Sequence, residues 1–368
     1  MATVDAQTLP TPDISVILPI FNAAPYLDQA LDSVQAQTLE NIEIICINDG
    51  STDNSLEIMR AHAALDSRIR IFDRENHGYG AEMNFGIDAA RGTYIAILEP
   101  DDWILPDMLA DMFCYAATFD TLIDIVKTPY WRIWMPDTPE QLRINCSFRG
   151  RIKPALQPFT MDDPGVFHLL RHHPCIWSAI YRRGFLTENN IRFHEIPGAG
   201  WADNPFLLDT LLRAKTIVYL DKPYYCYREE TPEKTRNMAI RQTLLPFERW
   251  NDMQDIIDEL HITNERILRV QINRGFIYLG GVMKEVPLSR EDVFDATCRM
   301  FARMDPDLVF TDPDISPSMK AIFADLRELP APAPDRLGYA KKLVREGVYN
   351  LKNTGPRMTL NTLKGVIG

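Results

Sequence analysis

The sequence predicts an α/β protein in which helices flank a parallel sheet, followed by a helical C-terminal region. Two patterns lead to this prediction. In roughly the first hundred residues, short apolar runs alternate with segments whose apolar residues recur at helical spacing, as in sheets built from right-handed strand–helix–strand units. From about residue 240 onward the apolar residues recur at helical spacing throughout.

The predicted strands are continuous apolar runs, which are typical of strands buried on both faces of a sheet. The first four occupy residues 14–21, 42–47, 69–72 and 93–98, and later ones occupy 122–127, 216–220 and 224–228. Pro25 suits the first turn of the helix after the first strand, and Gly92 ends the third helix, predicted at 81–91.

An acidic cluster, Glu99-Pro100-Asp101-Asp102, follows the fourth strand. Open α/β sheets bind ligands beyond the carboxyl ends of their strands. Carboxylates spaced on a rigid strand end suit a hard cation, Mn²⁺ or Mg²⁺, that can hold a substrate diphosphate. For an isolated pair of aspartates, a solvated acidic turn is the plainer alternative. The motifs that precede this cluster favour ligand binding.

Composition and turn chemistry exclude several classes of protein. The 368 residues carry a net charge of −12, which argues against a nucleic-acid-binding surface. The turn between Pro19 and Pro25 has no glycine, whereas a dinucleotide-binding loop needs glycines close to the pyrophosphate. No apolar run reaches the ~18 residues of a membrane-spanning helix. Scattered cysteines and the lack of a signal peptide lead us to expect a cytoplasmic protein.

Four groups of residues, in this order and at this spacing, resemble family 2 glycosyltransferases of the GT-A fold. They are Pro19-x-Phe21-Asn22, Asn48-Asp49-Gly50-Ser51-x-Asp53, Asn76-x-Gly78 with Asn84-x-Gly86, and Glu99-x-Asp101-Asp102. The resemblance covers roughly residues 14–103 and resumes near 175–228. It implies a GT-A-type, Rossmann-like mixed sheet and an enzyme of the bacterial polysaccharide or capsule type.

The resemblance also assigns roles to residues. It implies that Phe21 lies near the nucleobase, that Asp49 hydrogen-bonds the base, and that Asp101 contributes to the metal site. Each motif taken separately has a plainer alternative: Asp49 with Gly50 could merely form a turn, and Phe21 could be an ordinary core residue. The whole expected nucleotide-binding set is Pro19, Phe21, Asn22, Asp49, Gly78, Asn84, Glu99, Pro100 and Asp101.

Two departures from the family pattern concern the donor. Glu99 stands where the family usually has Asp, so its contact with the ribose or the metal is open. Met83 stands where the family often has Arg, so another residue must hold the nucleotide if that arginine does so. The identity of the donor sugar is therefore open.

For the acceptor side, the resemblance implies that Asp203 is the catalytic base. Ala202 replaces the Glu that the family often has before it, and Asp203 could instead cap a helix at 206–214. Glu195 is the next candidate for the base. Exposed aromatic rings can stack on sugars, although they are at least as often packing residues. The acceptor-side candidates are Trp131, Trp134, Trp177 and Trp201, and the diphosphate candidates are Arg228, Lys234 and Arg236.

We expect four segments along the chain: a lead-in at 1–13, a catalytic domain at 14–235, a helical region at 236–330, and a Pro-rich linker with a basic tail at 331–368. The residues after 338 include six Lys or Arg and one acidic residue. A basic amphipathic segment is typical of membrane-surface or partner binding. Gly347 and Gly355 weaken a continuous helix there, so a solvated, disordered tail is the alternative.

The sequence, with this resemblance, therefore predicts a metal-dependent hexosyltransferase-type enzyme that uses a nucleotide-diphospho-sugar donor, most readily a UDP-sugar. That the enzyme inverts the anomeric configuration is implied by the resemblance alone. Its acceptor would be a glycan or lipid-linked glycan, at the inner face of the plasma membrane, in cell-surface polysaccharide synthesis. Association of copies of the chain is left open. One alternative is a catalytically silent nucleotide-sugar-binding or scaffold protein. Another is a sugar-phosphate nucleotidyltransferase, which should have a glycine-rich basic loop after the first strand.

Overall fold

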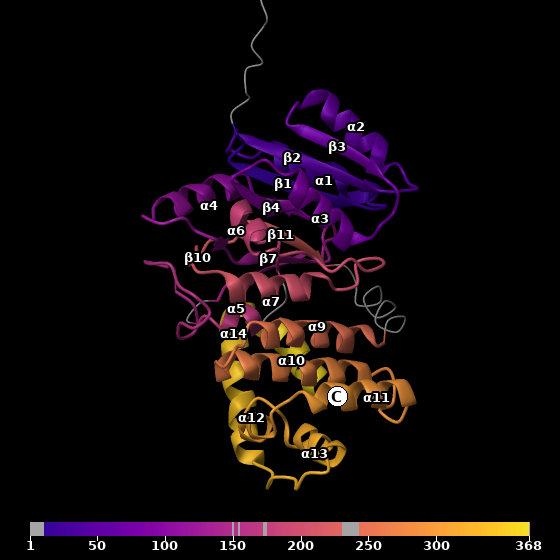
Figure 1. Cartoon of the computed structure of the whole chain (residues 1–368), viewed down its shortest axis with the longest axis vertical. Helices are drawn as coiled ribbons and strands as arrows, with labels where there is room; N and C mark the ends of the chain where they lie inside the picture. The colour runs from indigo at the N-terminus through magenta and orange to yellow at the C-terminus, as the bar shows by residue number, and fades with distance from the viewer. Residues whose placement is uncertain (1–10, 149–150, 154, 172–174, 230–242, 368) are drawn as a thin grey trace, which may run out of the picture.

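The computed structural model describes residues 11–148, 151–153, 155–171, 175–229 and 243–367. Two sheets occupy one end of the molecule and a set of helices the other (Figure 1). Among the described residues, no helix combines the length and apolar character that crossing a bilayer requires.

The larger sheet has seven strands in the order β10-β6-β9-β4-β1-β2-β3. Its strands are β1 (Ile14–Ile20), β2 (Ile42–Asp49), β3 (Ile69–Arg74), β4 (Tyr94–Ile97), β6 (Ile125–Lys127), β9 (Ala179–Arg182) and β10 (Ile217–Tyr219). The strands β1, β2, β3 and β4 run parallel to one another, as predicted. β9 runs antiparallel to both of its neighbours, which makes the sheet mixed.

A second sheet of four strands, in the order β5-β11-β7-β8, lies beside the end of β4. Its strands are β5 (Trp103–Ile104), β7 (Tyr130–Trp134), β8 (Leu142–Asn145) and β11 (Tyr225–Glu229). The predicted strand at 224–228 is therefore confirmed, but it lies in this smaller sheet. β5 follows the acidic cluster directly and pairs with β11, so the cluster is held between the two sheets.

Helices flank the large sheet. They are α1 (Ala24–Gln35), α2 (Ser55–Leu65), α3 (Tyr79–Ala89), α4 (Met108–Ala117), α5 (His168–Arg171), α6 (Arg183–Glu188) and α7 (Asp203–Arg213). α3 packs on β1 and β2. Its Gly86 permits this close approach, since a Cβ there would lie 2.5 Å from the Ile17 side chain.

The C-terminal helices are α9 (Leu245–Glu259), α10 (Glu265–Met283), α11 (Glu291–Ala302), α12 (Pro306–Thr311), α13 (Pro317–Leu326) and α14 (Arg336–Ile367). α9 to α13 enclose a core around Trp250, Phe301 and Phe323. Met253 of α9 and Ile267 of α10 belong instead to the core of the sheet. Because α9 packs on α7 and α10 packs on α5, the helical region is packed against the sheet domain.

Two sequence expectations about the ends of helices are wrong. Asp203 does not cap a helix that starts at Phe206, because α7 begins at Asp203 itself. Gly347 and Gly355 do not interrupt the C-terminal segment, because α14 runs through both. A glycine in a helix interior costs only about 1 kcal/mol, and ion pairs described below hold α14 to the body.

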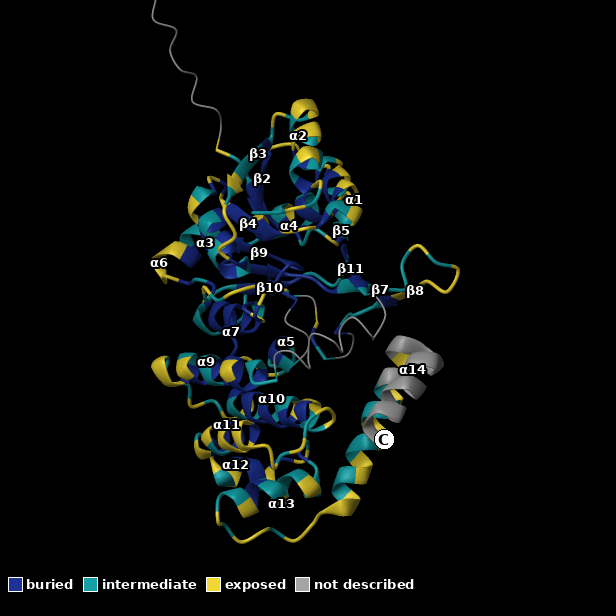
Figure 2. Cartoon of the chain, turned by 90° about the vertical axis from the view of Figure 1, so that its right-hand side faces the viewer, coloured by how far each residue is buried: buried dark blue, intermediate teal, exposed yellow. Residues whose placement is uncertain are grey.

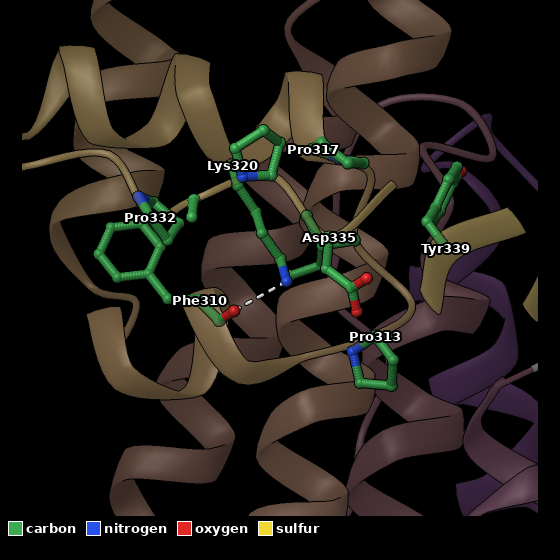
Figure 3. A pocket seen from close by; sticks show the side chains of 10 residues that line it. Phe310, Pro313, Pro317, Lys320, Pro332, Asp335 and Tyr339 are labelled. Atoms are coloured by element: carbon green, nitrogen blue, oxygen red, sulfur yellow. Dashed lines mark hydrogen bonds between the residues drawn. The ribbon is translucent and has the colours of Figure 1, made fainter. Parts of the chain in front are cut away.

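The Pro-rich linker before α14 lies over α12 and α13. A small cavity there is lined by Phe310, Pro332, Asp335 and Tyr339, with the Lys320 ammonium donating to the carbonyl of Phe310 (Figure 3). This cavity lies in the helical region, away from the acidic cluster after β4. Residues of the linker and of α12 and α13 line this cavity together, so the linker lies against these two helices.

Candidate active site

The carboxyl ends of β1, β2 and β4 meet the start of α7 at one edge of the large sheet. At the end of β1, Phe21 is 51% exposed, which is unusual for a phenylalanine and leaves its ring accessible. The neighbouring Asn22 has φ +50°. Its carboxamide oxygen accepts from the Thr52 backbone N–H at 2.8 Å, which joins the loops after β1 and β2.

Asp49, at the end of β2, is 5% exposed and holds the loop before α3. Its carboxylate oxygens accept from the backbone N–H groups of His77 at 2.7 Å and Gly78 at 3.2 Å. Gly78 needs its φ of +89°, and a Cβ there would lie 2.7 Å from the carbonyl oxygen of Ile196. The structure thus shows Asp49 as the anchor of this loop, and its contact with a base stays a prediction.

The first residue of α3 links this loop to β4. The Tyr79 hydroxyl donates to the Glu99 carboxylate at 2.6 Å, and its backbone N–H donates to the Gly198 carbonyl at 3.1 Å. Sequence reasoning missed Tyr79. Its one signal was a position next to Gly78, 20 residues before a glutamate that departs from the family pattern.

Glu99 lies partly buried beside two other carboxylates. Its pKa is raised to about 8, chiefly by burial; the Tyr79 hydrogen bond lowers the pKa, and the charges of Asp101 and Asp203 act in the same direction as burial. Asp101 is exposed, whereas Asp102 is 1% exposed. Carboxylates from β4 and α7, far apart in sequence, therefore share one electrostatic environment.

Asp102 has a structural role. Its carboxylate accepts from the Tyr225 hydroxyl at 2.8 Å and from the Arg228 backbone N–H at 2.7 Å. The Arg228 guanidinium donates to the carbonyl of Asp101 at 2.8 Å and to Asp137 at 2.8 Å, and it is 8% exposed. These contacts hold β11 to the acidic turn. A diphosphate contact for Arg228 stays a prediction, and Lys234 and Arg236 lie outside the described residues.

Asp203 opens α7, where helix N-terminal N–H groups favour a carboxylate. Burial nevertheless raises its pKa to about 6, while Asn204 and the charge of Arg274 lower it. The Asn204 amide donates to the Asp203 carboxylate at 3.1 Å. The amide oxygen accepts from Arg274 at 3.1 Å and from the Tyr278 hydroxyl at 3.0 Å. Two residues of α10 thus orient the amide that orients Asp203.

Asn84 joins α3 to the segment that leads to α7. Its carboxamide donates to the Phe193 carbonyl and the Glu195 carboxylate, both at 3.0 Å, and accepts from the Phe193 N–H at 2.9 Å. With its polar atoms engaged in this way, Asn84 positions the 193–195 segment, and its contact with a nucleotide stays a prediction. Glu195 is exposed.

Asp49, His77 and Glu82 form a group whose ligand atoms all lie within 4.8 Å of one another. Two observations weaken it as a metal site. The Asp49 oxygens already accept from backbone amides, and Arg74 pairs with the buried Glu82 carboxylate at 2.8 Å. Asp101, the predicted metal ligand, is not a member of this group.

The four tryptophans proposed for the acceptor differ in exposure. Trp177 is 3% exposed and stacks on Tyr225 with ring centroids 4.1 Å apart, so it is a core residue and that prediction is wrong. Trp131 and Trp134 lie half-buried on β7. Trp201 is 37% exposed, precedes Asp203 by two residues and lies near Tyr278. Of the four, Trp201 is best placed to meet a sugar.

The model of the family described as "Glycosyl transferase family 2" matches residues 15–176. Glycosyltransferase GlyG of Streptococcus pneumoniae is 43% identical over 226 residues, which cover 59% of this chain and 71% of GlyG. Uncharacterized glycosyltransferase EpsJ of Bacillus subtilis is 32% identical over 230 residues, 59% of this chain and 61% of EpsJ. The chain thus spans about three fifths of the length of EpsJ.

Among solved structures, S. aureus TarS 1-349 in complex with UDP-GlcNAc superposes with a TM-score of 0.64 at 19% identity. The match covers 91% of this chain and 92% of that one. The likeness extends over both the sheets and the helical region.

Proposed function

Because this chain belongs to glycosyl transferase family 2 and has a GT-A-type mixed sheet with a helical C-terminal region, we propose that it transfers a sugar from a UDP-sugar to a hydroxyl of a glycan or lipid-linked glycan, with inversion. One observation carries the proposal: Asp203, a partly buried carboxylate with a raised pKa, shares an electrostatic environment with Glu99 at the end of β4. In this proposal, Asp203 is the base and Glu99 the carboxylate on the donor side.

For the donor, we propose that the base lies against the exposed ring of Phe21, near Asp49. Asp49 holds the backbone N–H groups of His77 and Gly78, so the loop before α3 would lie beside the base. TarS was solved with UDP and with UDP-GlcNAc, which makes UDP-GlcNAc the first donor to test. Pro19, Gly78 and Pro100 would shape the site through the backbone, and Asn84 through its carboxamide contacts with Phe193 and Glu195.

We propose that Asp101, with Glu99, holds a Mn²⁺ or Mg²⁺ ion. The residues fit such an ion, because Glu99 and Asp101 lie two residues apart at the strand end, burial and then the charge of Asp101 raise the pKa of Glu99, and carboxylate oxygens suit hard cations. When bound, the ion would offset the charge that develops on the departing diphosphate. Asp49, His77 and Glu82 are the second candidate, at the cost of the Arg74 pair.

In the proposed reaction, Asp203 accepts the proton of the acceptor hydroxyl as that oxygen attacks the anomeric carbon of the donor sugar. The bond between this carbon and the diphosphate oxygen breaks, and UDP leaves. A base is most effective when its pKa lies near the working pH, and burial brings the pKa of Asp203 to about 6. Asn204 orients the carboxylate, and Trp201 offers a ring to the acceptor sugar.

We also keep the expected boundaries as proposals: a catalytic domain at 14–235, a helical region at 236–330 and a linker with tail at 331–368. A place at the cytoplasmic face of a membrane, in cell-surface polysaccharide synthesis, belongs to the same proposal. It would bring a lipid-linked acceptor within reach of Asp203.

The test is a panel of nucleotide sugars with the full chain, with and without Mn²⁺, read by thermal shift and by UDP release. We expect a UDP-sugar to raise the melting temperature and to be hydrolysed slowly without an acceptor. Binding without any turnover, on hydroxyl acceptors or water, would favour the catalytically silent alternative suggested by Glu99, Met83 and Ala202. A lack of binding by every nucleotide sugar would overturn the proposal.

A further inference from the structure

The C-terminal helix α14 carries an apolar stripe on its outer side. Leu337, Val344, Val348 and Leu351 are 69%, 67%, 47% and 50% exposed. Their spacings of seven, four and three residues place them on one side of a helix. Scattered exposed apolar residues are ordinary, but a row of four along one helix face is typical of an interaction surface.

A basic stripe runs directly beside the apolar one. Lys341, Arg345 and Lys352 are exposed, and their spacings of four and seven residues also place them on one side of the helix. At 100° of rotation per residue, Lys341, Lys352 and Arg345 lie about 50°, 70° and 90° around the helix from the centre of the apolar stripe. We define the α14 face as these three basic residues with Leu337, Val344, Val348 and Leu351.

The opposite side of α14 is attached to the rest of the molecule. Glu346 pairs with Arg151 at 2.8 Å, and the same guanidinium lies 3.6 Å from the Tyr349 ring centroid. Lys342 pairs with Asp314 at 3.7 Å. These contacts fix which side of the helix points outward, and Figure 2 shows α14 at the edge of the molecule.

We propose that the α14 face binds the surface of an anionic lipid membrane, with the apolar side chains in the headgroup boundary and the basic ones against the lipid phosphates. Residues 336–352 contain five basic residues and one acidic residue, in a protein of net charge −12. Anionic lipid complements that local charge. A second copy on the same face would bring Lys341, Arg345 and Lys352 close to their own counterparts, so charge disfavours a dimer through it.

This proposal rests on α14 alone and not on the transferase reaction, because no residue of the α14 face belongs to the candidate active site. The two can therefore fail separately. A protein that binds vesicles but does not transfer sugar would leave the surface intact, and the reverse would leave the site intact.

The test is sedimentation of the full chain with vesicles of phosphatidylcholine alone or with about a third phosphatidylglycerol. Each basic residue near an anionic surface strengthens binding by roughly fivefold. The triple variant Lys341→Glu, Arg345→Glu, Lys352→Glu should therefore lose roughly 100-fold or more in apparent affinity. Val344→Ser with Val348→Ser should weaken binding at unchanged charge.

A matched control, Arg60→Glu with Arg266→Glu and Arg299→Glu, makes the same change in net charge at exposed positions on other helices. It should bind nearly as the parent chain does. Equal loss in the control and the α14 variant would overturn the proposal, as would equal binding to the two kinds of vesicle. A concentration-dependent dimer abolished by Val344→Ser with Val348→Ser, without vesicle binding, would also overturn it and identify a second copy as the occupant.

Discussion

The two sides of the candidate site use their acidic residues differently. On the β1–β4 side, Asp49 accepts from two backbone amides and Asp102 accepts from Tyr225 and Arg228, so these carboxylates hold the backbone in place. On the α7 side, Asp203 receives one side-chain hydrogen bond and has a pKa raised to about 6 by burial. The first kind of carboxylate builds the site, and the second is suited to exchange a proton.

The strongest test of this comparison is Asp203→Asn. The amide keeps the shape of the side chain but cannot take a proton, so transfer should fall by roughly 10²–10⁴-fold while donor affinity stays nearly constant. Initial rates of UDP release with acceptor, together with calorimetric UDP binding, measure both. Transfer at the parent rate would move the base elsewhere, with Glu195 tested next.

Asp101→Asn probes the exposed carboxylate of the β4 side. If Asp101 ligates the cation, the Mn²⁺-dependent part of UDP binding should weaken by roughly 100-fold. Residues that only hydrogen-bond a metal ligand already cost up to about 100-fold in metal affinity when they are replaced, and a direct ligand should cost at least as much. Calorimetry with and without Mn²⁺ measures this difference. His77→Ala is the comparison for the second candidate group, and loss of Mn²⁺ dependence in that variant alone would place the ion there.

Asp49→Ala should act mainly on stability. It leaves two backbone N–H groups of the loop without their acceptor, which costs about 2–4 kcal/mol in unfolding free energy. Urea denaturation measures the loss, and amide hydrogen exchange at His77 and Gly78 should increase. Asp49→Asn, which retains one carbonyl oxygen, is the milder control. An unchanged stability in the alanine variant would show that the anchor is dispensable.

Asn204→Ala tests whether α10 reaches the base through this amide. We expect a decrease of about tenfold in kcat, since misorienting a base costs less than removing it. Tyr278→Phe, which removes one of the two donors to Asn204, should have a smaller effect in the same direction. Equal kcat in Asn204→Ala and the parent chain would assign the Asn204 contacts to packing alone.

The smallest expected effect concerns pH. A carboxyl whose pKa is higher in the folded than in the unfolded protein binds more protons when folded, so stability should fall as pH rises from about 4 to about 6. At neutral pH the Asp203→Asn variant should therefore be more stable than the parent by about 1–2 kcal/mol. Transfer by the parent should decline as pH drops through about 6. Thermal melts at pH 4 and 7 check the first expectation and a rate profile the second.

The sequence by itself determined the local features of this protein. The four parallel strands, the helices between them and the helical C-terminal region follow from patterns within short segments. Burial on both faces selects continuous apolar runs in the strands, and burial on one face selects apolar residues at every third to fourth position in the helices. The order of the motifs at the strand ends was also enough to indicate family 2. The glycine-free turn between Pro19 and Pro25 excluded a dinucleotide-binding loop.

Only the tertiary structure decided which side chains meet. Tyr79 reaches Glu99 20 residues away, and Asn84 reaches Phe193 109 residues away. It also decided that Trp177 is core, that Asn204 connects Asp203 to α10, and that ion pairs attach one side of α14. These outcomes depend on how elements pack, and packing is the sum of many weak contacts between segments whose local sequences do not encode each other's position.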